Sequence, residues 1–394
     1  MALGVYISVP FCRTKCSYCN FASDVFSRAR FARYVDRICD DIHNASKTAA
    51  QMGGKLEYDV DSIYLGGGTP TVLEAEQLGR IFASVRSQFD VKANAEITVE
   101  CAPGTLTNGM VETLLRCGVN RVSLGVQSFV DQEAAAVGRL HKRATVTDDI
   151  ARLRGAGITN FNIDLIAGLP HQTAESWEFS LSEVVAAGAP HASVYMLEVD
   201  EDSRLGRELL AGGTRYHAHF VPDEEATADF YLAACQCLES AGIIQYEISN
   251  FAREGFESGH NLKYWTRQPY LGFGVDAHSM LFSMAPAIDA VRFACSDSLE
   301  AYVNGIATQP MLVSVQAALE ESFFLGLRLN RGIDLREVTG KFGVAAAHHA
   351  QTIIGKLVED GLMEQQGDRA RLNSRGRLLS NEVFERFLTE ELVR

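Results

Sequence analysis

The sequence predicts an α/β protein, a partial parallel barrel of six strand–helix units that is followed by a smaller α+β domain. Over residues 1–200, short apolar segments alternate with amphipathic helical patterns, which is typical of a parallel sheet covered by helices. A charged stretch with glycines interrupts this alternation at residues 200–225. Near the end of the chain the pattern changes to three helices and a hairpin, the order of a winged-helix-like module.

Six segments have the length and the apolar content of buried strands. They lie at residues 3–9, 60–65, 95–100, 121–126, 160–167 and 191–197. Helical patterns follow them at about 28–52, 74–88, 107–117, 144–156 and 174–187. Because ligands collect at the carboxyl ends of the strands in parallel barrels, we expect the functional residues in the loops that follow these strands.

The remaining elements divide the chain into three parts. We predict the barrel at 1–220, a segment that covers the barrel at 221–312 and the winged-helix-like domain at 313–394. The second part begins with a helix at about 225–241, after the stretch at 200–225 that we interpret as a linker. In the third part, helices are predicted at 316–328, 334–341 and 344–360, and a hairpin strand at 369–373.

Composition and charge narrow the classes of function. The chain has 394 residues, is 47% hydrophobic, and contains no apolar run long enough to span a membrane. No secretory signal is visible at the start, and nine cysteines, an odd number, fit a reducing compartment, so we expect a cytoplasmic protein. A net charge of −14 argues against binding to nucleic acid or to anionic membranes. The tail at 310–394 carries 11 Lys and Arg against 12 Asp and Glu, so partner binding fits it better than DNA binding.

The loop after the first strand carries three cysteines, Cys12, Cys16 and Cys19, in the spacing C-x3-C-x2-C. Thiolates this close together can converge on one soft metal centre. A [4Fe–4S] cluster held by three cysteines leaves one iron open to a further ligand. The alternatives are a zinc site with a distant fourth ligand, a disulfide with a spare thiol, and unrelated buried cysteines.

Glycines and polar residues follow the later strands. The segment 66–71 reads Gly-Gly-Gly-Thr-Pro-Thr, which lets a ligand approach the backbone closely, although a tight turn explains it about as well. Glu100, Gln127 and Asp164 lie in or just after buried strands, where a carboxylate is costly unless it is paired or faces a ligand. Arg139 is either a partner for such a carboxylate or an exposed surface residue. Together these residues predict a polar mouth.

A histidine with aromatic neighbours lies further along the chain. His260 is followed by Tyr264 and Trp265, and this combination suits an axial ligand of haem or a site for a flat aromatic ligand. A lone histidine is more often structural, so that alternative stays open. His278 lies in a second turn, which follows two glycines.

Together these motifs resemble the radical-SAM family of oxygen-independent coproporphyrinogen III oxidases, also called dehydrogenases, and their haem-chaperone relatives. The resemblance extends over nearly the whole chain. It rests on the loop 6–19, on the segments 66–70, 124–128, 138–141, 164–170, 245–251 and 260–265, and on the winged-helix-like tail.

The resemblance implies a radical-SAM barrel in which Cys12, Cys16 and Cys19 ligate a [4Fe–4S] cluster. In such proteins S-adenosylmethionine binds the open iron, and an electron from the cluster cleaves its sulfonium to give a 5′-deoxyadenosyl radical. The positions that match S-adenosylmethionine contacts of the family are Tyr6, Tyr18, Gly67, Gly68, Thr69, Glu100, Gln127, Arg139, Asp164 and His278.

Two features favour the haem-chaperone branch over the oxidase branch. The oxidases typically carry a further cysteine two residues after the third, where this chain has Phe21. The chaperones typically carry a His-Asn-x-x-Tyr-Trp motif, present here from His260 to Trp265. This branch implies haem binding, haem-acceptor proteins and an electron donor for the cluster, and it leaves a homodimer open. Ser8 stands where the family usually has a histidine, which leaves the role of that histidine without a counterpart.

Two other functions stay open on the sequence. One is an enzyme that oxidatively decarboxylates the propionates of coproporphyrinogen III. The other is an interaction protein whose cysteine loop binds zinc and whose tail docks a partner.

Overall fold

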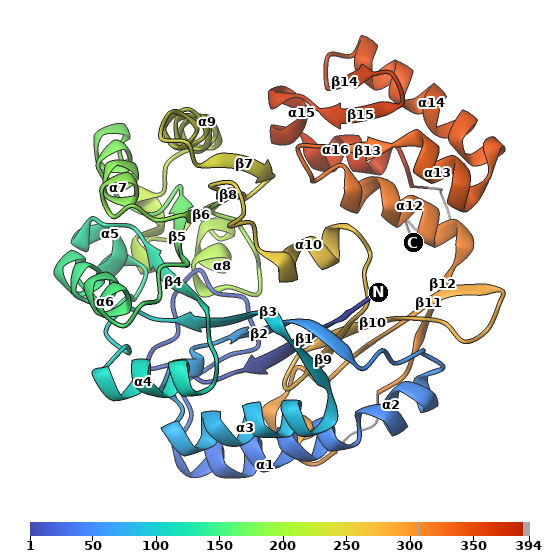
Figure 1. Cartoon of the computed structure of the whole chain (residues 1–394). Coiled ribbons are helices and arrows are strands. Elements are labelled where there is room, and N and C mark those ends of the chain that lie inside the picture. The colour runs from blue at the N-terminus through green and yellow to red at the C-terminus, as the bar shows by residue number, and fades with distance from the viewer. Residues whose placement is uncertain (306–307, 389–394) are drawn as a thin grey trace.

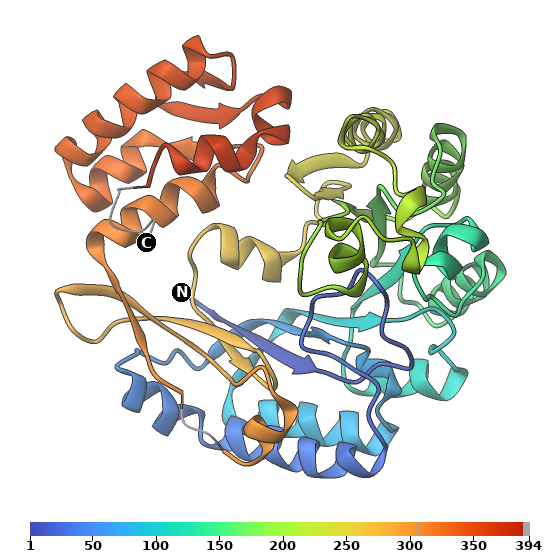
Figure 2. The same cartoon turned by 180° about the vertical axis from the view of Figure 1, so that it is seen from behind.

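A computed structural model describes residues 1–305 and 308–388, and its main element is a twelve-stranded sheet (Figures 1 and 2). The centre of the sheet is formed by β1 (Leu3–Val9), β2 (Asp59–Gly67), β3 (Asp90–Cys101), β4 (Arg121–Gln127), β5 (Phe161–Ala167) and β6 (His191–Met196). These strands pair in chain order and in parallel. The predicted α/β fold class with a mostly parallel sheet is therefore confirmed.

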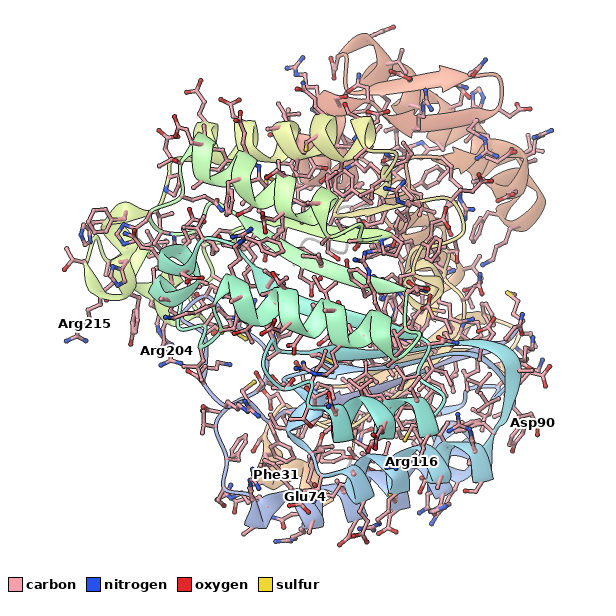
Figure 3. The ribbon with its side chains drawn as sticks, turned by 60° about the vertical axis from the view of Figure 1, so that its left-hand side comes forward. Phe31, Glu74, Asp90, Arg116, Arg204 and Arg215 are labelled. Atoms are coloured by element: carbon pink, nitrogen blue, oxygen red, sulfur yellow. The ribbon has the colours of Figure 1, made fainter. Side chains whose placement is uncertain are left out.

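Helices cover the outer face of these strands, as Figure 3 shows from the side. They are α1 (Ala29–His43), α2 (Ala45–Met52), α3 (Ala75–Gln88), α4 (Asn108–Arg116), α5 (Asp131–Ala136), α6 (Arg143–Gly155) and α7 (Ala174–Ala186). In α1 the buried residues Phe31, Tyr34, Ile38 and Ile42 recur at helical spacing and pack on the sheet. The predicted helix at 28–52 is divided at Asn44, and α5 was not predicted.

The two faces of the barrel strands differ in chemistry. In β5, Phe161, Ile163 and Leu165 belong to the main hydrophobic core, whereas Asn162 and Asp164 line the cavity inside the barrel. Successive side chains of a strand point to opposite faces, so one seven-residue strand serves both surroundings. The inside of this barrel is therefore polar, and the apolar core lies between the sheet and its helices.

Residues 221–312 extend both edges of the sheet, where the sequence predicted only a covering segment. The helix α9 (Glu224–Ser240) leads to β7 (Ile244–Glu247) and β8 (Asn250–Ala252), which continue the edge beyond β6. After α10 (Gly259–Trp265), β9 (Tyr270–Phe273) pairs in parallel with β1. The other edge is completed by β10 (His278–Phe282), β11 (Ile288–Ala294) and β12 (Met311–Ser314), with α11 (Leu299–Val303) between the last two.

The predicted linker also contains structure. Within 200–225 lie α8 (Arg204–Leu210) and η2 (Arg215–Phe220), which project beyond the carboxyl ends of the strands. Figure 3 places Arg204 and Arg215 at this end and Asp90, where β3 begins, at the opposite end. The segment is short and polar, so its sequence resembles a linker although it contacts the cysteine loop.

The C-terminal part contains the helices and the hairpin that were predicted. It comprises α12 (Val315–Gly326), β13 (Ile333–Asp334), α13 (Leu335–Phe342), α14 (Val344–Glu359), β14 (Met363–Gln366), β15 (Arg369–Leu372), α15 (Ser374–Leu378) and α16 (Ser380–Glu385). Its own core includes Phe323, Ile354 and Leu372. An isolated bridge between Glu247 and Leu329 joins it to β7, and α10 lies between it and the barrel strands (Figures 1 and 2).

The division at 220 and 312 stays a prediction. Among the helices that the structure describes, none combines the length and the apolar character that crossing a bilayer requires.

Candidate functional site

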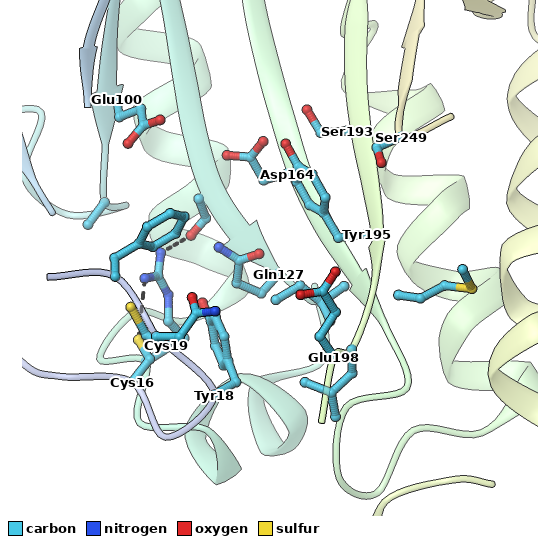
Figure 4. A pocket seen from close by; sticks show the side chains of 18 of the residues that line it. Cys16, Tyr18, Cys19, Glu100, Gln127, Asp164, Ser193, Tyr195, Glu198 and Ser249 are labelled. Carbon is cyan, nitrogen blue, oxygen red and sulfur yellow. Dashed lines mark hydrogen bonds between the residues drawn. The ribbon is translucent and has the colours of Figure 1, made fainter. Parts of the chain in front are cut away.

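A cavity of about 860 Å³ occupies the inside of the barrel and opens at the cysteine loop (Figure 4). It brings together most of the predicted site, namely Cys12, Cys16, Tyr18, Cys19, Gly67, Gly68, Thr69, Glu100, Gln127, Arg139 and Asp164. Figure 4 shows Cys16 and Cys19 on one side and Asp164 and Gln127 across the cavity. These side chains come from loops and strand ends far apart in the sequence, and the parallel sheet places them at one end.

The remaining predicted residues lie elsewhere. Tyr6, Tyr264 and His278 line a neighbouring cavity of about 290 Å³, which shares Gly67 with the larger one. His260 and Trp265 line neither of these two cavities. The His-Asn-x-x-Tyr-Trp motif touches the large cavity through Asn261.

The cysteine loop is closed by backbone hydrogen bonds and held by neighbouring elements. Cys12 N donates to Asp24 O over 3.0 Å, and Asp24 N donates to Pro10 O over 2.9 Å. The ammonium of Lys15 donates to the backbone oxygen of Phe21 over 2.6 Å, inside the loop. From α8, Leu205 N donates to Ser17 O over 2.8 Å. The loop therefore has a defined shape before any ligand binds.

The thiols of this loop are separate donors at the mouth of the cavity. All three cysteines are free, with Cys16 buried and Cys12 and Cys19 partly exposed. The hydroxyl of Thr69 lies 3.9 Å from the Cys12 sulfur, and the Arg139 guanidinium lies 3.6 Å from the Cys16 sulfur. Burial raises the pKa of the Cys12 thiol.

This donor set fits a [4Fe–4S] cluster. Among the residues that the structure describes, no three His, Cys, Asp or Glu side chains form a group that would hold one metal ion. A tetrahedral zinc site needs its ligands gathered around one centre, whereas a [4Fe–4S] cluster spreads three thiolates over three irons. Three free thiols on one loop are consistent with the second arrangement.

The glycines after β2 are required by close chain packing. A Cβ atom on Gly68 would lie 2.7 Å from Val9 O and 2.8 Å from Phe11 O, both backbone atoms that cannot yield cheaply. Gly68 N donates to the same Val9 oxygen over 2.9 Å, which ties this turn to the start of the cysteine loop. Gly67 has a φ of +95°, a conformation that favours glycine. From the sequence, these glycines indicated either the close approach of a ligand or a tight turn. The structure shows that close packing of the chain also requires them.

Glu100 lies beside this turn with an unusual protonation equilibrium. It accepts hydrogen bonds from the Tyr64 hydroxyl at 2.8 Å and from Gly67 N at 3.2 Å. Burial, with the charge of Asp164, raises the pKa of Glu100 to about 7. A buried carboxylate beside exposed backbone groups can bind an ammonium group, which would restore its ionised form. The residues present therefore fit the amino-acid end of S-adenosylmethionine.

Asp164 and Arg139 complete this end of the cavity. Asp164 accepts hydrogen bonds from Asn162 Nδ2 at 2.7 Å and from Ser123 Oγ at 3.1 Å, and burial raises the pKa of its carboxyl. Arg139 donates to Gly125 O, while its buried Nε has no hydrogen-bond partner among the residues described. The surface alternative for Arg139 is thus wrong, because its side chain reaches the cavity and contacts Cys16.

In the smaller cavity, Tyr6 is partly buried, and its ring stacks on that of Tyr64 with 6.2 Å between centroids. Burial raises the pKa of Tyr6 above its usual range. His278 is exposed, and its Nε2 lies 3.6 Å from Asp276. The structure therefore separates His278 from the other predicted S-adenosylmethionine contacts, apart from Tyr6 and the shared Gly67.

The structure corrects the expectation that His260 presents an imidazole to haem. Its Nδ1 lies 2.9 Å from Ser62 Oγ and its Nε2 lies 2.9 Å from Tyr264 Oη, so both ring nitrogens are engaged. Burial and the nearby charges of Lys263 and Arg121 lower the pKa of His260 to about 3. Neither nitrogen is available to an iron in this conformation. The structural alternative for this histidine fits the geometry.

Trp265 is covered from one side. The Arg328 guanidinium lies over its ring at 4.3 Å from the centroid, and its indole nitrogen is buried without a hydrogen-bond partner among the described residues. One face of this ring is therefore occupied by Arg328.

Sequence reasoning missed several residues that line the large cavity, among them Tyr64, Arg121, Asn162, Ser193 and Tyr195. A signal for them was present in the strand alternation. In β4, Arg121 and Gln127 occupy alternate positions that point inward. Reading each strand for the chemistry of its inner face would have found them.

The chain matches two family models. The radical SAM superfamily model matches residues 6–184, and the HemN C-terminal domain model matches residues 313–379. The structure of the coproporphyrinogen III oxidase HemN from Escherichia coli aligns with a TM-score of 0.82 at 23% identity, and covers 98% of this chain and 90% of that one. The matches define a radical-SAM protein with a HemN-type C-terminal domain, and the structural likeness shows the fold.

Curated relatives narrow this class. The heme chaperone HemW of Bacillus subtilis is 34% identical over 98% of this chain and 99% of its own length. The heme chaperone HemW of Lactococcus lactis is 30% identical over 99% and 98%, respectively. That of Escherichia coli is 33% identical over 70% of this chain and 69% of its own length. The chain therefore belongs to the heme chaperone HemW family of radical-SAM proteins.

Proposed function

We propose that this protein is a radical-SAM haem chaperone, which binds haem and delivers it to acceptor proteins. The observation that carries the proposal is the similarity to HemW relatives over essentially the full length of both chains. It includes the winged-helix-like part as well as the barrel. The cytoplasmic location and a possible homodimer stay predictions.

The carboxyl end of the barrel supplies the groups that such a protein needs. Cys12, Cys16 and Cys19 would hold the [4Fe–4S] cluster, which supplies single electrons when an external donor reduces it. The Gly67–Thr69 turn and Glu100 would hold the amino-acid end of S-adenosylmethionine. Tyr18, Gln127, Arg139 and Asp164 line the same cavity and would enclose the rest of that ligand.

The second candidate is coproporphyrinogen III oxidation, which the likeness to the HemN fold brings into view. Phe21 argues against this oxidase activity. This residue occupies the position of the additional oxidase cysteine, is 63% exposed, and lines both cavities beside the cysteine loop. An apolar ring at that point changes the chemistry of the surface that faces the ligand, so the chaperone is favoured.

Anaerobic reconstitution followed by three parallel assays tests the proposal. We expect haem binding, transfer of the bound haem to an apo-haem protein, and no consumption of coproporphyrinogen III when S-adenosylmethionine and a reductant are present. A Phe21→Cys variant serves as a matched comparison for the oxidase assay. Multiple turnovers of coproporphyrinogen III by the unaltered protein would overturn the proposal in favour of the oxidase, and failure to bind haem would overturn it outright.

A further inference from the structure

The large cavity continues from the cysteine loop to the amino ends of the barrel strands. Arg121 is the first residue of β4 and Gln127 the last, and both line this cavity. The cavity is therefore lined from both ends of this seven-residue strand. The predicted S-adenosylmethionine contacts extend toward Arg121 as far as Glu100, which is in register with Ser123, and no predicted contact lies beyond it at Arg121 itself.

Arg121 is a buried cation without a direct partner. Its residue is 2% exposed, its Nε has no hydrogen-bond acceptor, and no hydrogen bond or ion pair joins its guanidinium to any residue that the structure describes. Arg267 shows the usual treatment of such a group in the same chain. It is 5% exposed and pairs with Glu321 at 2.8 Å and Asp289 at 3.0 Å. A buried charge left unpaired is costly, so Arg121 calls for an anion.

The two cavity-lining carboxylates on which the charge of Arg121 acts already have partners of their own. Glu100 is hydrogen-bonded to Tyr64 and Gly67, and Asp164 to Asn162 and Ser123. Arg121 acts on both only through space, and the pKa of each stays raised by burial despite that charge. The alternative is that Arg121 serves only as a distant counter-ion for these two carboxylates. An experiment has to separate that role from ligand binding.

The cavity that Arg121 lines carries further residues with hydrogen-bond donors. Asn250 and Asn261 line the same cavity, and Asn261 belongs to the motif that the sequence associated with haem. Arg328 adds a second guanidinium, which is 3.8 Å from Glu247. Leu378 and Asn381, from the α15–α16 region, bound the cavity from the C-terminal part. Amide and guanidinium donors beside one apolar residue suit a carboxylate on an otherwise apolar molecule.

We propose that Arg121 binds a carboxylate of the ligand that enters the amino end of the barrel cavity. The identity of that ligand rests on the proposed function, under which it is haem and the carboxylate is a propionate. A guanidinium can give a carboxylate two parallel hydrogen bonds, which fixes the orientation of the group as well as attracting its charge. The site thus recognises the acidic edge of the macrocycle and makes no use of its iron.

A comparison of the affinities for haem and for its dimethyl ester tests this role of Arg121, because the ester keeps the iron and the ring but lacks both carboxylates. We expect the unaltered protein to bind haem about tenfold or more tighter than the diester in Soret titrations, the scale of a charge-assisted hydrogen bond. In Arg121→Met the haem affinity should fall to that of the diester, while the diester affinity stays unchanged. Arg143→Met is the matched control, because Arg143 is an exposed arginine that pairs with Glu183 outside the cavity.

The contrary outcomes are distinct. Equal binding of haem and diester by the unaltered protein would overturn the inference and leave the chaperone standing, whereas failure to bind either would overturn the proposed function. Undiminished discrimination in Arg121→Met would identify Arg121 as a counter-ion only. Should that variant not fold, Arg121→Lys replaces it. We expect about a threefold loss of discrimination there, because an ammonium cannot form the paired bonds, and full discrimination would again overturn the inference.

Discussion

The cysteine loop and the motif helix α10, which lie toward opposite ends of the barrel, are built in opposite ways. At the carboxyl end, loops place thiols, glycines and a carboxylate around the cavity, and Arg139 Nε and His141 Nε2 have no hydrogen-bond partner among the residues described. At the amino end, the motif helix α10 is pinned: Glu96 accepts from Gly259 N at 3.0 Å and from His260 N at 3.1 Å, and the His260 ring joins Ser62 to Tyr264. The cysteine loop and the His260–Trp265 motif were both predicted to bind ligands, but their side chains have different roles. The first leaves its functional groups available to ligands, and the second uses them to hold an element in place.

Removing the cysteines should give the largest effect in this comparison. We expect Cys12→Ala, Cys16→Ala and Cys19→Ala each to abolish the cluster, because the loop supplies only three thiolates and the cluster needs all of them. About four irons and four sulfides per chain should be found in the reconstituted protein and none in these variants. Cys39→Ala is the control, since Cys39 is buried in α1 and packs with the core. Zinc in stoichiometric amount without labile sulfide would contradict the assignment.

Replacing His260 should affect stability before it affects haem. In His260→Ala the hydroxyls of Ser62 and Tyr264 lose a buried partner, so we expect the free energy of unfolding to fall by about 2 to 4 kcal/mol. The exposed His278 provides the contrast, and His278→Ala should stay within about 0.5 kcal/mol of the unaltered protein. Chemical denaturation without haem measures both. A His260 variant of unchanged stability that has lost haem affinity would return the residue to the role of iron ligand.

The smallest predicted effect is a pH dependence at the open end. The pKa of Glu100 is raised to about 7, so the neutral acid predominates below pH 7 and the carboxylate above it. Only the carboxylate attracts the ammonium group of S-adenosylmethionine. Affinity should therefore rise about fivefold between pH 6 and pH 7, following the ionised fraction. Glu100→Gln should bind more weakly and without this slope, and an equal slope in both proteins would assign the titration to another group.

Local pattern was enough to predict the barrel strands and the composition of the open end. The first strand was predicted at its observed bounds, and the cysteine spacing, the glycines and Glu100 all lie at strand ends where a parallel sheet must bring them together. Each of these features depends on neighbours in the chain or on the general rule for parallel sheets.

Features that depend on distant pairing could not be read in this way. The strands β7 to β12 have short, ordinary sequences, and their place at both edges follows from partners far away in the chain. The state of His260 depends on Ser62, which lies 198 residues away. Arg121 was overlooked because an arginine at the start of a strand looks exposed until the inner face of the barrel is known. The two ends therefore differ in how local their determinants are.

The pairing of β1 with β9 has a consequence for biosynthesis. The strand that carries the cysteine loop lies between β2 and β9, and Gly4 is in register with Tyr270. Tyr34, which is buried beside β1, also depends on this later part of the chain, because its hydroxyl accepts a hydrogen bond from Val275 N at 3.0 Å. At about 5 to 20 residues per second, the ribosome delivers β9 on the order of 15 to 50 s after β1. Until then the cysteine loop follows a strand that is paired on one side only. A cluster inserted during translation would therefore bind a nascent chain in which β1 still lacks its second neighbour.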